Sequence, residues 1–93
     1  MSSYEVNEVW IPAMGARTVG DIGFKIMLEQ IRADLGPGSS VVGSVSRVLV
    51  TVKIDASSVE KAKTVASSTI AEVMRGRPFI IDGTAPRSAV ALG

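Results

Sequence analysis

Residues 47–54 read Arg-Val-Leu-Val-Thr-Val-Lys-Ile, and this stretch decides the fold prediction. Valine or isoleucine stands at every second position, with Arg, Leu, Thr and Lys between them. A period of two places alternate side chains on opposite faces of a β-strand, so the pattern predicts a strand with one buried face. We therefore expect a sheet, and no helix, in this part of the chain.

The residues before this stretch extend the strand-like region upstream. Residues 40–46 are also rich in Val, but Gly43 and Ser44 interrupt them. The interruption predicts either a tight turn between two strands or a bulge in one bent strand, and both readings of residues 40–54 stay open. Further upstream, residues 5–11 predict another strand, which Pro12 brings to an end.

Two helices are predicted from capping signals. Ser57 and Glu60 have the spacing of a capping box, so a helix is expected from there to about Arg75. Thr18 and Asp21 have the same spacing and predict a helix over residues 18–35 that Gly36-Pro37-Gly38 terminates. The apolar residues of the second helix form one stripe, which predicts one buried face: Val59, Ala62, Ala66, Ile70 and Val73.

The C-terminal part adds short strands. Residues 79–81 predict a strand, Asp82-Gly83 a turn, and residues 89–92 one more strand. The element order predicts one α+β domain over residues 1–93, a ferredoxin-like split βαβ plait with a mostly antiparallel sheet and two helices on one face. The competing layout has one long middle strand and a C-terminal hairpin. We expect four residues to be almost fully buried: Leu28, Val50, Val52 and Ile70.

The composition excludes several classes of function. Ten basic against nine acidic residues, with aromatic residues at 4%, leave neither the charge nor the stacking rings for nucleic-acid binding. The absence of Cys and His removes disulfides and the usual zinc and haem ligands, so we expect no metal and no cofactor. There is no apolar run long enough for a membrane span and no signal-peptide pattern, so a cytoplasmic protein without membrane association is expected.

The first helix carries a second apolar stripe. Phe24, Met27, Leu28, Ile31 and Leu35 share the face that is expected to pack on the sheet. The second stripe lies on the opposite face of the helix. An exposed apolar stripe usually marks an interface, so we predict a homo-oligomer contact on that face. The alternative is that the protein's own connector, residues 14–17, or its C-terminal tail covers it. The predicted contact residues are Val19, Ile22, Gly23, Ile26 and Ala33.

Catalytic candidates are few. Without His or Cys, acid–base chemistry falls to Asp, Glu, Lys or Tyr, and no pair of these has an informative spacing. Glu5 and Glu8 are expected on an exposed strand. Arg75, Arg77 and Arg87 are candidate anion contacts near the end of the second helix, although an arginine in a last turn is also favoured by the helix dipole alone. We therefore expect a protein that is not an enzyme.

Residues 69–79, Thr-Ile-Ala-Glu-Val-Met-Arg-Gly-Arg-Pro-Phe, resemble a segment of the coupling (effector) proteins of bacterial multicomponent diiron monooxygenases. In that family a helix runs into a Gly-Arg-Pro-Phe turn. The resemblance implies a cofactor-free α+β domain that docks on a hydroxylase and tunes its active site.

The leading hypothesis is a non-catalytic, self-associating interaction module or accessory subunit of a larger assembly. It rests on the missing catalytic side chains, the two-faced first helix and the near-zero net charge of +1. The alternatives are the effector protein, which has a protein partner, and a small-molecule enzyme with a carboxylate/arginine site at a subunit cleft.

Overall fold

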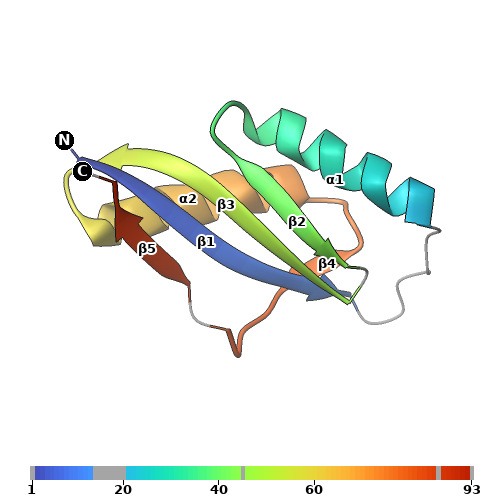
Figure 1. Cartoon of the computed structure of the whole chain (residues 1–93). Coiled ribbons are helices and arrows are strands. Elements are labelled where there is room, and N and C mark those ends of the chain that lie inside the picture. Colours follow the sequence, from blue (N-terminus) through green and yellow to red (C-terminus); the bar gives the residue numbers. More distant parts are fainter. Residues whose placement is uncertain (1, 14–20, 45, 86, 93) are drawn as a thin grey trace.

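The computed structural model describes residues 2–13, 21–44, 46–85 and 87–92. Two helices lie on one face of a five-stranded antiparallel sheet, which confirms the α+β class and the placement of both helices (Figure 1). The elements in chain order are β1 (Ser2–Pro12), α1 (Asp21–Leu35), β2 (Ser40–Ser44), β3 (Arg47–Ala56), α2 (Val59–Met74), β4 (Phe79–Ile81) and β5 (Ser88–Ala91).

The sheet is built around β1. Its strand order is β2-β3-β1-β4, and every neighbouring pair is antiparallel. One edge of β1 pairs with β3 along nearly its whole length. The other edge is shared, because β5 pairs with Tyr4–Asn7 and β4 pairs with Trp10–Pro12. The two short strands therefore follow one another along the same edge of β1, with a break beside Glu8 and Val9.

The core lies between the sheet and the helices. Val50, Val52 and Ile70 are at most 3% exposed, as expected from the sequence. The expectation for Leu28 is wrong, because this side chain is only half-buried. The reason is the position of α1, which packs on the edge strand β2 and against α2. Phe24 and Ile31 point into that contact and are buried, whereas Leu28 lies at its margin.

Helix α2 begins one residue later than its capping signal suggests. Ser58, not Ser57, is the N-cap, and its Oγ accepts a hydrogen bond from the backbone N–H of Lys61 at 3.2 Å. The buried stripe also differs at both ends, because Val59 is 37% exposed and the last buried position is Met74 rather than Val73. The predicted cap at Thr18 lies outside the described residues.

Residues 40–54 form a hairpin rather than one bent strand. Ser44 at the end of β2 pairs with Arg47 at the start of β3. Gly43, one residue before Ser44, has φ of 147°, a conformation that L side chains rarely adopt. A Cβ at Gly43 would lie 2.2 Å from the backbone oxygen of Arg47. The close approach of β2 to β3 therefore requires glycine at this position.

Replacing Gly43 with alanine is expected to lower the free energy of unfolding by more than ~1 kcal/mol, because the new methyl group collides with backbone and the φ is strained. Chemical denaturation measures the change. Gly83→Ala is the control, since a Cβ there meets nothing within 4 Å and Gly83 does not have a positive φ. Equal stability of Gly43→Ala and wild type would contradict the prediction.

Candidate functional site

The outer face of α1, turned away from the sheet, is exposed. Ile22 is 77% exposed and Ile26 is 54% exposed, and Gly23 and Ala33 are exposed beside them. These are four of the five predicted contact residues. The fifth, Val19, lies outside the described residues. The helix thus presents two large aliphatic side chains to solvent, one turn apart.

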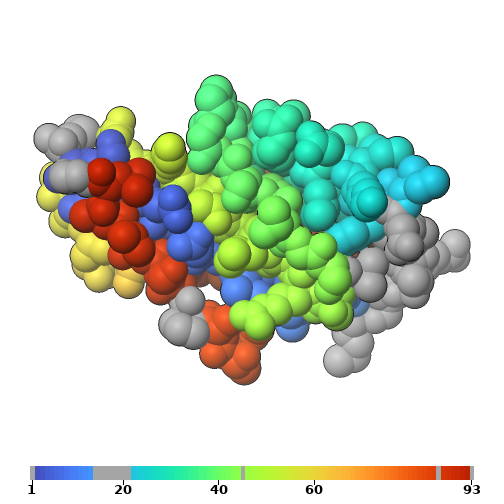
Figure 2. All heavy atoms as spheres, viewed as in Figure 1, coloured from blue at the N-terminus to red at the C-terminus, as the bar shows by residue number. Residues whose placement is uncertain are grey.

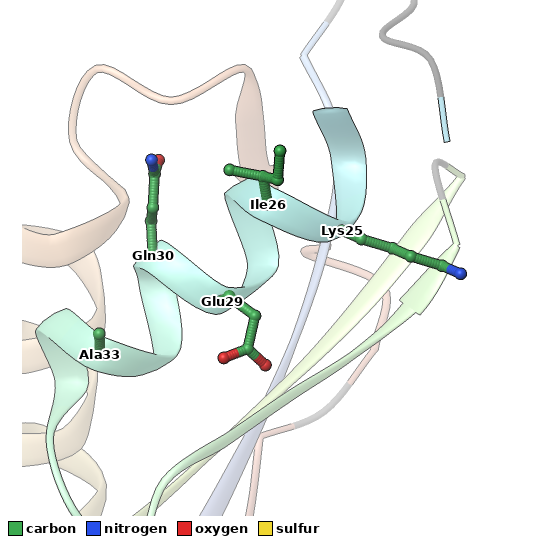
Figure 3. A pocket seen from close by; sticks show the side chains of 5 residues that line it. All are labelled: Lys25, Ile26, Glu29, Gln30 and Ala33. Atoms are coloured by element: carbon green, nitrogen blue, oxygen red, sulfur yellow. The ribbon is translucent and has the colours of Figure 1, made fainter. Parts of the chain in front are cut away.

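A shallow depression of about 390 Å³ follows the same face. Figure 3 shows Ile26 and Gln30 pointing to the same side of the helix, with Ala33 one turn further on. Lys25 and Glu29 complete the lining, and Glu29 forms an ion pair with Arg32 at 3.2 Å. The outer face of α1 is therefore a mixed surface in which the apolar side chains are interrupted by charges.

A second apolar surface lies on the sheet face turned away from the helices, called the open face below. The register places Val42, Leu49 and Val9 in one row across β2, β3 and β1. Ile11 and its partner Ile80 continue the patch toward the end of β1. Figure 2 looks onto this face, where atoms of β1, β2 and β3 lie at the surface.

The next row of the open face is polar and internally hydrogen-bonded. Thr51 Oγ1 donates to Asn7 Oδ1 at 2.6 Å, and Asn7 Nδ2 donates to Ser88 Oγ at 3.2 Å. These polar side chains bond to one another. A partner that covered the row would therefore break fewer hydrogen bonds to water than one that covered unpaired polar side chains. The sequence signal for this surface is the run Val9-Trp10-Ile11, because successive residues of a strand point to opposite faces and an apolar run therefore places apolar side chains on both faces.

Glu8 lies inside the protein, contrary to the expectation of an exposed position. Its register partner is Val50 on the helix-covered face, and its side chain is 1% exposed. Trp10 Nε1 donates to Glu8 Oε1 at 3.2 Å. The side chain of Arg87 is 39% exposed, and its guanidinium forms an ion pair with Glu8 Oε2. The pair is a close charge contact without hydrogen-bond geometry, since Oε2 accepts no hydrogen bond from any residue that the structure describes.

The buried carboxylate borders a cavity of about 280 Å³ at the break between β4 and β5. Asp82 donates its backbone N–H to Val9 O at 2.8 Å and begins the turn that spans this break. The pKa of the Asp82 carboxyl is lowered, mainly because Thr84 donates its hydroxyl and its backbone N–H to it, with a smaller contribution from the charge of Arg47. The ion pair with Arg87 offsets the charge of Glu8, and the hydrogen bond from Asp82 to Val9 joins the C-terminal segment to β1.

The three arginines predicted to contact an anion each meet a carboxylate of this chain. Arg75 pairs with Glu72 at 3.0 Å. Arg77 pairs with Asp34 at 3.0 Å, which links α1 to the segment after α2. Arg75 and Arg77 border one cavity, of about 460 Å³, whereas Arg87 borders the cavity beside Glu8. The structure thus brings Arg75 and Arg77 together and places Arg87 elsewhere.

Among the described residues, there is no group of three or more carboxylates placed to hold a metal ion. Neither α1 nor α2 has the length and apolar character needed to cross a bilayer. Comparison of the chain with protein-family models, with curated proteins and with solved structures finds no match.

Proposed function

We propose that the protein is a non-catalytic, self-associating interaction module or accessory subunit, and that it acts as a homo-oligomer. The observation that carries this proposal is the exposure of Ile22 and Ile26, at 77% and 54%, on the outer face of α1. Burying such a side chain in a contact stabilises the oligomer by ~1.5–3 kcal/mol relative to leaving the side chain in water. A domain of 93 residues has a limited core and gains stability from a partner that covers these side chains.

Replacing Ile26 with aspartate is expected to weaken self-association, because it places a charge among apolar side chains at the contact. Sedimentation at equal concentration is the measurement, with circular dichroism to show that the fold is retained. Val65→Asp is a matched control, since Val65 is 48% exposed on the other helix. A wild-type protein that is monomeric at high micromolar concentration would contradict the proposal.

The finer fold assignment is also a proposal: a ferredoxin-like split βαβ plait, with β5 as an addition. The strand order β2-β3-β1-β4, the antiparallel pairing and the two helices on one face support it. A cytoplasmic location stays a prediction from the sequence.

A second proposed function is that of an effector protein of a diiron monooxygenase. What favours it is the path of the chain that carries the resemblance: α2 ends at Met74, Gly76 takes φ of 78°, and β4 begins at Phe79. Co-purification with a hydroxylase encoded by a neighbouring gene tests this function. Loss of binding on replacing surface residues of this turn would support it.

The small-molecule enzyme is the third hypothesis. Such a site needs a carboxylate and an arginine, and Glu8 and Arg87 form this pair beside a cavity of about 280 Å³. In the single chain the two charges neutralise each other, so the site would need a ligand that separates them. Self-association is the better supported function because it requires no such rearrangement.

A further inference from the structure

We propose that the open face of the sheet packs against the same face of a second copy of this chain. This inference rests on the proposed self-association and adds a second contact surface, with another copy of the chain as the partner. It differs from the contact on α1, because the open face lies on the other side of the sheet from both helices (Figure 1). The two contacts are therefore separable by mutation.

The first argument is the apolar surface at the centre of the open face. Val42 is 54% exposed, Leu49 is 38% exposed and Ile80 is 50% exposed, with half-buried Val9 and Ile11 between them. The register makes these five side chains contiguous across four strands. A contiguous apolar patch of this kind marks an interaction surface, whereas isolated exposed side chains do not.

The second argument is the size of the face. With strands ~4.8 Å apart and a rise of ~3.3 Å per residue, the paired strands present roughly 500 Å² in projection. Packing two copies face to face then covers about 1,000 Å² in projection. The accessible surface area that is buried is larger, because side chains protrude from the sheet, and it reaches the size of a specific interface. Two sheets packed face to face are also a common way to bury a sheet face.

The third argument is charge. One end of the open face carries Glu5, Lys53 and Asp55, and the other end carries Arg47 with Asp82 near it. The two rows between the ends are uncharged. A two-fold axis parallel to the strands, between β1 and β3, places β3 of each copy over β1 of the other. Because Glu5 and Lys53 are register partners, Lys53 of each copy then faces Glu5 of the other, so the face complements itself at this end.

Leu49→Lys is the test, because Leu49 lies in the middle of the apolar row and is exposed enough for lysine to be tolerated in the monomer. We expect the dimer dissociation constant, measured by sedimentation, to rise by ~30-fold or more, as for a central interface residue. Val65→Lys is the matched control, with a similar exposed valine on α2, and is expected to leave the dissociation constant unchanged.

A second measurement covers the case in which the lysine variant does not fold. The chain has no cysteine, so Leu49→Cys introduces a single reporter thiol that keeps the apolar character of the site. Its reaction with a thiol reagent is expected to slow as protein concentration rises through the dissociation constant. The thiol of Val65→Cys is expected to react at the same rate at all concentrations.

The outcomes separate the inference from the proposed function. If wild type self-associates but Leu49→Lys leaves the oligomer intact, or the Leu49→Cys thiol reacts equally fast at all concentrations, the open-face inference is wrong and self-association stands. Loss of the oligomer in Ile26→Asp would then assign the contact to α1. If wild type is monomeric at high micromolar concentration, both are wrong.

Discussion

Replacing Arg87 with methionine is expected to lower the free energy of unfolding by ~3–5 kcal/mol. The reason is that Glu8, 1% exposed, loses the cationic partner that lies beside its carboxylate and is left as a buried acidic group without a counter-charge among the described residues. The hydrogen bond from Trp10 Nε1 to Glu8 Oε1 remains, but one neutral donor does not compensate a buried charge. Urea denaturation of both proteins at equal concentration measures the difference.

Two further variants test whether the buried charge is the cause. In Glu8→Gln combined with Arg87→Met, the neutral amide still accepts from Trp10, and stability is expected to return to within ~1–2 kcal/mol of wild type. Arg75→Met is the surface control, because Arg75 and Glu72 are 76% and 69% exposed and such pairs contribute ~0–1 kcal/mol. A loss in Arg87→Met no larger than that of Arg75→Met would contradict the account.

Replacing Ile31 with alanine is expected to lower the free energy of unfolding by ~2–5 kcal/mol. Ile31 is 0% exposed and is among the largest fully buried side chains. It lies on the face of α1 that meets β2 and α2, so truncation removes buried methyl groups and leaves a cavity. The same denaturation experiment measures it.

Leu28→Ala is the comparison for that prediction, on the same helix one turn away. Leu28 is only half-buried, so water can fill part of the space and the loss is expected to be smaller than for Ile31→Ala. If Leu28→Ala were the more destabilising of the two, α1 would be rotated about its axis relative to the structure. Protein concentration must be equal throughout, because self-association shifts apparent stability.

Local patterns in the sequence were enough to predict the elements. The alternation from Val48 to Ile54 corresponds to β3, and the glycines and proline after Leu35 end α1 where expected. The short strand at residues 79–81 and the last strand are both present, the latter as Ser88–Ala91. These features depend on side chains close together in the chain, so periodicity and capping identify them. The outward stripe on α1 was predictable for the same reason, since helical spacing alone places Ile22 and Ile26 together.

The burial of Glu8 and the apolar row of the open face could be identified only from the tertiary structure. Glu8 is a charged residue on a strand, and Arg87, 79 positions later in the chain, packs beside it and supplies the opposite charge that permits its burial. The apolar row of the open face joins Val42, Leu49 and Val9 from three strands, so it exists only once the register of β1, β2 and β3 is set. What the sequence by itself determined was the class of each element and the apolar face of each helix. Long-range pairing decided that Glu8 is buried in β1 and that apolar residues of separate strands combine into one surface. Neither feature depends on neighbours along the chain.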